Sequence, residues 1–256
     1  TALVAALCLS AGVGTARADA VLDWNATAAA LPIPAPPVQA RIMAAMHGAV
    51  HDAVNAIEPR YRTYRFAIEA PAGASQDAAA ASAAHAVLVA MVPAQKAALD
   101  AALAQSLAKV GDERSRADGV AVGKAAADQM LAWRAKDNFD AKADDKPGSG
   151  AGVWQRTPPG LAPGVLPQFG GVTPFVLKSA DQMAARGRPA LASREFARDL
   201  DEVKRLGSRH STERSAEQTA VAVFWAGNEI PQLNAAARAA SQARNQSMHD
   251  NAHLFA

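Results

Sequence analysis

The stretch from Gly152 to Ser179 reads GVWQRTPPGLAPGVLPQFGGVTPFVLKS, and it separates helical sequence on either side. Its prolines and glycines exclude a regular helix, because proline lacks the backbone donor and fixes φ. It is nevertheless too apolar for a solvated linker. We therefore expect an ordered, non-helical loop packed on a helical core through Trp154, Phe169 and Phe175. Two interpretations stay open: such a loop contributes to function, or it only caps the core.

The composition favours closely packed helices. The chain has 256 residues, enough for one domain or two small ones with a sizeable core. Half of the residues are hydrophobic but only 5% are aromatic, and alanine supplies much of the apolar content. Alanine has the highest helix propensity and loses no side-chain entropy on folding. The net charge of +2 gives no support to a nucleic-acid or anionic-membrane partner.

The first long helix ends at Ile57, before Glu58-Pro59. The segment from Leu31 to Pro37 is proline-rich, and we expect it to be extended and not helical. The apolar positions that follow fall in a sector of about 120° on a helix. They are Val38, Ile42, Met46, Ala49, Val50, Ala53 and Ile57. At one edge of this sector we expect a buried ion pair to a neighbouring helix, formed by Arg41, Asp52 and Asn55.

Capping residues and periodicity predict further helices. Their expected extents are 76–91 after a Ser75 cap, 93–111, 113–136, 193–206 after a Ser193 cap, and 211–226 after a Ser211 or Thr212 cap. Two more segments start near Ile230 and Asn245. The predicted fold class is all-α: a helical bundle over 21–136, a Pro/Gly-rich loop region over 137–192, and helices over 193–256 that continue the same domain. The polar connection from Asp137 to Gly152 is expected to be mobile.

Residues 1–20 have the features of an export signal. An apolar run from Ala2 to Val13 precedes Ala16-Arg17-Ala18, a small-x-small cleavage pattern, although the basic n-region is missing. The run is too short to cross a membrane. We expect the mature protein to begin at Asp19 or Val21 and to lie in the periplasm or outside the cell. Cys8 would be removed, which excludes disulfides and thiolate metal sites from the mature chain.

Several segments, in order, resemble exported bacterial proteins of the vanadium-dependent haloperoxidase and type 2 phosphatidic acid phosphatase superfamily. The similarity covers nearly all of the chain after residue 20, and no single motif is decisive. The segments are Trp24-Asn25, Arg41 to Ile57, Trp154 to Pro159 (WQRTPP), Thr173 to Leu177 (TPFVL), Phe196 to Lys204 (FARDLDEVK), Ser211 to Thr219 (STERSAEQT) and Phe224-Trp225.

The resemblance implies a reaction centre around vanadate or phosphate, held by lysine and arginine and completed by a histidine. Such an oxyanion requires clustered cationic donors and one nucleophilic imidazole. The family supplies them as an Arg-Pro segment with an upstream lysine, a Pro-Ser-Gly-His segment and a Ser-Arg segment before the final histidine, and this chain has none of the three. Arg188-Pro189 with Lys178 is a chance match, since it lies outside the expected context. We therefore assign no catalytic, cofactor-binding or metal residue.

The six histidines give no strong metal signature. His47 and His51 are spaced by four residues on the first long helix, as are His249 and His253 in the last segment. This spacing can place two imidazoles on one metal, but Gly48 stands where a zincin has its glutamate base. We expect His47 to be solvated or at the edge of the core. His85 and His210 have no partner visible in the sequence.

Two hypotheses of function follow. In the first, the chain is the N-terminal helical part of a haloperoxidase-like or phosphatase-like enzyme, inactive by itself, whose catalytic half follows Phe255-Ala256. Its parent reaction would be halide oxidation by hydrogen peroxide or phosphate ester hydrolysis, with vanadate as a cofactor of the whole protein and a small-molecule substrate. In the second, it is an exported helical binding protein without catalysis. Neither involves nucleic acid or a membrane span after signal removal, and homo-oligomerisation is compatible with both.

Overall fold

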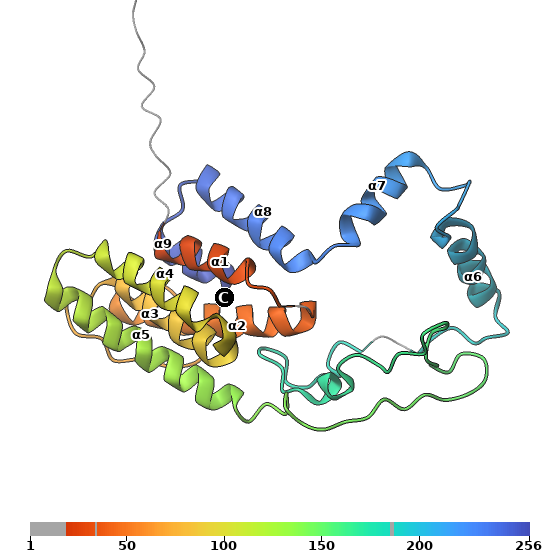
Figure 1. Ribbon diagram of the computed structural model, residues 1–256, viewed down its shortest axis with the longest axis horizontal. Coiled ribbons are helices and arrows are strands. Elements are labelled where there is room, and N and C mark those ends of the chain that lie inside the picture. The colour runs from red at the N-terminus through yellow and green to blue at the C-terminus, as the bar shows by residue number, and fades with distance from the viewer. Residues whose placement is uncertain (1–18, 34, 185–186) are drawn as a thin grey trace, which may run out of the picture. The chain divides into compact units, whose positions relative to one another are not determined.

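The structure, a computed structural model, describes residues 19–33, 35–184 and 187–256. Cys8, Arg186 and the proposed signal up to Ala18 therefore lie outside the described residues. The described residues contain nine α-helices, two 3-10 helices and no strand, which confirms the all-α fold class (Figure 1). The helices are α1 (Ala20–Ala29), α2 (Pro36–Ile57), α3 (Gln76–Met91), η1 (Pro93–Gln95), α4 (Lys96–Ala108), α5 (Glu113–Arg134), η2 (Pro167–Gly171), α6 (Arg194–Gly207), α7 (Ala216–Trp225), α8 (Glu229–Ala243) and α9 (Met248–Phe255).

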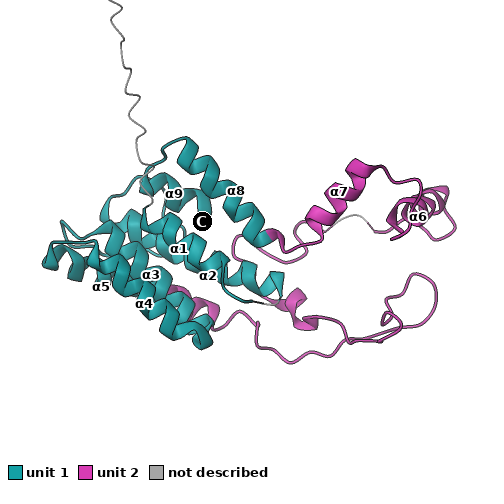
Figure 2. Cartoon of the chain, turned by 45° about the horizontal axis from the view of Figure 1, so that its top comes forward, with its two compact units in different colours: residues 1–128, 230–256 teal, residues 129–229 magenta. Residues whose placement is uncertain are grey.

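The chain divides into two compact units (Figure 2). Unit 1 comprises the residues up to Asp128 together with Ile230–Ala256, so it is assembled from two separate stretches of sequence. Unit 2 is the intervening segment, Gln129–Glu229. In the described part of the chain, no helix is both long and apolar enough to cross a membrane.

Helix α3 is the centre of unit 1. It contacts α1, α2 and α4, and most of its alanines are fully buried. Its start agrees with the prediction, because the Ser75 side chain accepts a hydrogen bond from the Ala78 N–H. Helix α5 approaches the α3 backbone closely at Gly119 and Gly123, where a side chain would collide with carbonyl oxygens of α3. Small residues therefore set the packing distances in this core.

Helix α2 begins earlier than the sequence suggested. Pro36 and Pro37 form its first turn, so the predicted lead-in of extended chain ends before them. Proline is tolerated there because the first helical N–H groups have no intrahelical acceptor. The buried face is also wider than the apolar sector, since it includes Gln39, His47 and His51.

Among the described residues, Asp52 does not form the ion pair to a neighbouring helix that the sequence suggested. Asp52 instead binds the backbone of the loop that follows the helix: its carboxylate accepts from the N–H groups of Tyr64 at 2.7 Å, Arg65 at 3.1 Å and Phe66 at 2.8 Å. Asn55 accepts from the N–H groups of Arg60 and Tyr61 in the same way. Both side chains therefore hold a loop, because its backbone donors have no helix or sheet partner.

Helices α1 and α9 cover α2, and they also join one another. Asp19 caps α1 by accepting from the Leu22 N–H at 2.9 Å, and its other oxygen accepts from Asn251 of α9 at 2.7 Å. Burial raises the pKa of the Asp19 carboxyl. Trp24 of α1 is buried and donates to Ser106 of α4 at 3.2 Å. The first and last described helices are thus part of one core.

In unit 2, the loop is attached to the end of α5. Phe175 contacts Trp133 edge to face and lies 4.0 Å below the Arg134 guanidinium, and Phe169 contacts Phe139. Arg134 is buried, where it donates to Asp137 at 2.6 Å and to the Thr173 carbonyl at 2.6 Å. The loop contains the short 3-10 helix η2. The expected burial of Trp154 is wrong, since 49% of this residue is exposed.

The last two helices of unit 2 are exposed on most of their surface. Ser193 caps α6 as predicted. Helix α7 is capped by Ser215 with Gln218 in a capping box, so the predicted caps Ser211 and Thr212 lie in the turn before it. The exposed large apolar residues of these helices are Leu200, Val203, Val221, Val223, Phe224 and Trp225.

Candidate functional site

The most concentrated polar cluster in the core of unit 1 is centred on Asn25 of α1, which is fully buried. Its Nδ2 donates to Asn234 Oδ1 of α8 at 2.6 Å and lies 2.8 Å from His47 Nε2 of α2. Its Oδ1 accepts from the Arg238 guanidinium of α8. We call these four residues the Asn25 hub. The hub joins α1 and α2 to α8, whose Asn234 is 209 residues from Asn25 in the sequence.

The hub fixes the protonation of His47. Arg238 can only donate, so the Asn25 atom that faces it is the oxygen, and the amide nitrogen must face His47. His47 Nε2 is then an acceptor, and in the neutral ring the proton is on Nδ1. Burial lowers the pKa of His47 to about 3, so the ring is neutral at physiological pH. The ring also stacks on Phe255 of α9, with centroids 5.1 Å apart.

His51, one turn further along α2, has the opposite tautomer. Its Nε2 lies 3.0 Å from the Arg62 carbonyl oxygen, which can only accept, so Nε2 carries the proton. The Nδ1 atoms of His47 and His51 are buried and have no hydrogen-bond partner within the described residues. The His51 ring faces His253 of α9, with centroids 5.8 Å apart, and His253 stacks on Tyr61 at 4.1 Å.

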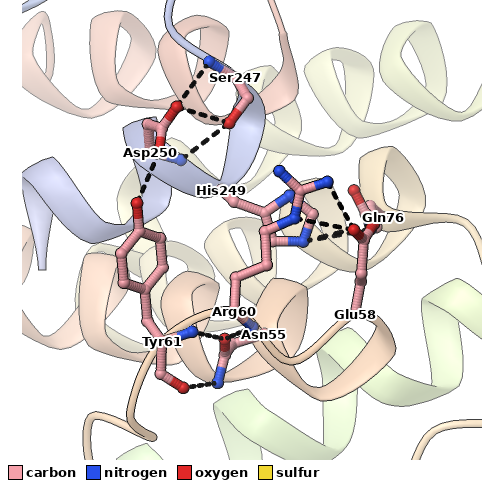
Figure 3. A network of polar contacts seen from close by, with 8 residues as sticks. All are labelled: Asn55, Glu58, Arg60, Tyr61, Gln76, Ser247, His249 and Asp250. Atoms are coloured by element: carbon pink, nitrogen blue, oxygen red, sulfur yellow. Dashed lines mark hydrogen bonds and ion pairs between the residues drawn. The ribbon is translucent and has the colours of Figure 1, made fainter.

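A second network joins α9 to the loop after α2 (Figure 3). The Tyr61 hydroxyl donates to Asp250 at 2.5 Å, and this bond, with the bonds from Ser247, holds the pKa of the Asp250 carboxyl below its usual value. On the other side of α9, His249 Nε2 lies 3.3 Å from Gln76 Nε2 and 3.8 Å from Glu58. Burial and then the Arg60 charge lower the pKa of His249.

The structure corrects the expectation for His47. Both His47 and His51 are only 2% exposed, because α1 and α9 cover the face of α2 that the apolar pattern left out. His85 lies 2.8 Å from Asp100 and edge-on to Trp24, and His210 is exposed in the turn after α6. Within 19–33, 35–184 and 187–256, no three histidine, cysteine, aspartate or glutamate side chains are grouped to hold a metal ion.

The candidate cations Arg238, Lys178 and Arg188 do not form a vanadate or phosphate centre together. The anion needs several cationic donors directed at one point. In the Asn25 hub the Arg238 guanidinium is bonded to Asn25, and the His47 Nε2 lone pair is used by the same amide. Lys178 is an exposed residue of unit 2, and Arg188 donates to the Gly152 carbonyl. We therefore derive no catalytic step from these groups.

The Asn25 hub and the network around α9 can hold the helices of unit 1 in a fixed arrangement. Because both contain histidines, they can also respond to protonation. Sequence reasoning missed the hub, because Asn234 and Arg238 are more than 200 residues from Asn25 and no spacing rule connects them. The sequence did draw attention to Asn25, because Trp24-Asn25 is one of the segments that carry the family resemblance. Nothing in the sequence pointed to Tyr61.

The chain is similar in structure to a protein known from its crystal structure as the first bacterial vanadium-dependent iodoperoxidase. The match has a TM-score of 0.74 at 23% sequence identity, and it covers 92% of this chain and 63% of that chain. No family model and no curated protein matches the sequence. The chain therefore has the fold of a vanadium-dependent haloperoxidase, as the sequence resemblance implied, and it spans less than two thirds of the length of that protein.

Proposed function

We propose that this chain is the helical scaffold of an exported enzyme of the vanadium haloperoxidase or acid phosphatase type. The parent reaction would be oxidation of a halide by hydrogen peroxide or hydrolysis of a phosphate ester. The observation that supports the proposal is the structural similarity to an iodoperoxidase over 92% of this chain. We also propose that the oxyanion centre comes from sequence other than the described residues.

The proposal explains why the polar groups of unit 1 are bonded to one another. A scaffold must hold its helices in a fixed arrangement, and buried polar groups that satisfy each other specify such an arrangement. In the Asn25 hub, every polar atom of the Asn25 side chain is bonded. In this proposal, any vanadate of the whole protein is bound by other residues, and unit 1 supports them.

The proposal is tested with orthovanadate and two samples: this 256-residue chain and the natural polypeptide purified from its source. A ligand that binds only the folded state raises the melting temperature. We expect no vanadate-dependent shift for the chain alone, with sulfate as the control anion. We expect a shift for the natural polypeptide, together with iodide oxidation or phosphate ester hydrolysis. Micromolar vanadate binding by the chain alone, or neither activity in the natural polypeptide, would contradict the proposal.

Export is part of the proposal, and Asp19 supports a cleavage site directly before it. Asp19 caps α1 and binds Asn251, so cleavage after Ala18 keeps both interactions, whereas cleavage before Val21 removes them. N-terminal sequencing of the natural protein from the periplasm or the culture medium should therefore begin at Asp19. A protein that retains Leu3 to Val13 in these compartments would contradict it.

The alternative is an exported helical binding protein without catalysis. The observation that favours it is the exposed apolar surface of α7, where Val223, Phe224 and Trp225 are each more than half exposed. Exposed apolar patches of this kind mark interaction sites for proteins or ligands. A natural polypeptide that has neither activity but elutes as a complex with another protein would favour this alternative.

A further inference from the structure

The contact between α2 and α9 is made largely by aromatic and imidazole rings. Phe255 stacks on His47, His253 stacks on Tyr61, and His253 also faces His51. We infer that this contact is an acid-sensitive latch, which holds α9 on α2 while His47 is neutral and releases α9 when His47 takes a proton.

The Asn25 hub leaves no place for a second proton on His47. The neutral ring has its proton on Nδ1, so the added proton must enter at Nε2, where the Asn25 amide already donates. Asn25 cannot turn its oxygen to the ring, because that oxygen accepts from Arg238 and the amide nitrogen donates to Asn234. Protonation therefore directs two donors at each other and adds a charge close to the Arg238 guanidinium.

Helix α9 is the element whose opening the latch requires. It packs mainly on α1 and α2. It is held by ring contacts and a few polar links, such as Asn251 to Asp19 and Tyr61 to Asp250. Local opening requires less free energy than global unfolding. Phe255 stacks on the His47 ring while α9 is closed. In the inferred open form the ring turns away from the Asn25 amide into the space that Phe255 leaves, where water hydrates its charge.

Other titratable groups face the contact between α2 and α9. Acid favours the open form through some of them and the closed form through others. Protonated His249 is disfavoured by burial and by Arg60 but attracted by Glu58 at 3.8 Å, so its effect is smaller. Burial raises the pKa of Asp19, so acid favours the closed form there. Asp250 stays ionised to a pH below its usual range because its pKa is lowered. The charged and titratable groups around α9 are Asp19, His47, His51, Glu58, Arg60, Tyr61, Arg238, His249, Asp250 and His253.

The size of the effect follows from linkage. While α9 is closed, His47 stays neutral down to a pH of about 3, whereas an imidazole in water titrates near pH 6.5. At pH 5, His47 is therefore protonated in the open form but neutral in the closed form. This protonation shifts the equilibrium towards the open form. The open population should rise about 30-fold between pH 7.5 and pH 5.

Hydrogen exchange of the whole chain at pH 7.5 and pH 5 tests the latch, with protection factors corrected for the intrinsic exchange rate at each pH. We expect the protection factors of the α9 amides to fall about 30-fold and, at both pH values, to lie far below those of the buried α3 amides from Ala80 to Val87, because α9 opens without global unfolding. Unchanged protection of α9, or protection of α9 equal to that of α3, would overturn the inference.

Two variants assign the effect to His47. In His47→Gln the carboxamide oxygen can accept from Asn25 and does not titrate, so the pH dependence of α9 exchange should disappear. In Asn25→Asp the carboxylate can accept from protonated His47, so the 30-fold change should shrink even if His47→Gln does not fold. The control His85→Gln, on another surface, should keep the full change. A full change in either His47→Gln or Asn25→Asp would also overturn the inference.

Discussion

Gly123 of α5 lies directly against the backbone of α3: a Cβ at this position would come within 2.2 Å of the Ala79 carbonyl oxygen. Because the colliding atom belongs to the backbone of a buried helix, it cannot move aside as a flexible side chain could. The two helices must separate if any larger residue takes this place.

Gly123→Ala should therefore destabilise unit 1, although alanine is the better helix former by about 1 kcal/mol. We expect a loss of about 2 kcal/mol in the free energy of unfolding, measured by urea titration, since overpacking a core costs about 1–3 kcal/mol. Gly111→Ala is the matched control, because a Cβ there meets nothing within 4 Å. A Gly123→Ala protein as stable as the control would show that α3 and α5 are not in close contact.

Asp52→Ala should release the loop that follows α2. The three backbone N–H groups of Tyr64, Arg65 and Phe66 would lose their acceptor, and we expect a loss of about 2 kcal/mol. Trypsin should cut the folded variant faster at Arg62 and Arg65 than it cuts the unaltered chain. Asp140→Ala, at an exposed position, is the control and should change neither property. Equal cleavage rates for the two variants would contradict the role of Asp52.

Asp137→Ala should damage unit 2, because it leaves the Arg134 guanidinium buried without its carboxylate. Removal of one partner of a buried ion pair typically costs about 3–5 kcal/mol. The variant Arg134→Met with Asp137→Ala should recover part of this loss, since no buried charge remains. Urea unfolding followed by far-UV circular dichroism measures both. If the double variant were less stable than the single one, the burial of Arg134 would not be the cause.

Trp154→Ala should have a small effect of less than about 1 kcal/mol, because 49% of Trp154 remains exposed in the folded chain. A buried Trp154, as the sequence analysis expected, would have implied a loss of about 3 kcal/mol or more. Phe175→Ala is the comparison, since Phe175 contacts both Trp133 and Arg134 and should give the larger loss. The order of the two losses decides between these interpretations of the loop.

The stability of unit 1 should fall as the pH is lowered. His47 has a folded pKa of about 3, below the value of about 6.5 in the unfolded chain, so the unfolded state binds more protons in this window. Stability is therefore complete above pH 6.5 and is lost towards pH 3. Between pH 7.5 and pH 4 the loss from this residue is about 3 kcal/mol. Urea titration of the unaltered chain and of His47→Gln separates the contribution of His47 from that of the carboxylates. Equal free energies of unfolding for the two proteins at pH 4 would contradict the prediction.

The helices could be predicted because their signals are local. Ser75 and Ser193 cap the predicted helices, and the 76–91 segment matches α3 at both ends. At Pro36, and at Ser215 in place of Ser211 or Thr212, the prediction was off by a turn because several nearby residues can start a helix equally well.

The polar core could not be predicted, because its partners are distant in sequence. Periodicity placed His47 off the apolar face of its helix, but α9 brings Phe255 over the ring. Asp52 looked like one half of an ion pair, since an isolated carboxylate gives no sign that backbone N–H groups of a loop will surround it. Trp154 was expected inside for its size alone, although exposure depends on what the fold places next to it.

The division of unit 1 into two stretches of sequence has a consequence for the order of folding. The hydrogen bond between Asn25 and Arg238 spans 213 residues, and that between Asp19 and Asn251 spans 232. Helices α1 to α5 are contiguous in the chain and can collapse early, whereas such distant pairs form slowly. Until α8 and α9 arrive, the buried face of α2 around His47 and His51 stays open to solvent. The folding chain would therefore pass through an intermediate with this face uncovered, and surface of this kind is what makes such intermediates prone to aggregation and in need of chaperones.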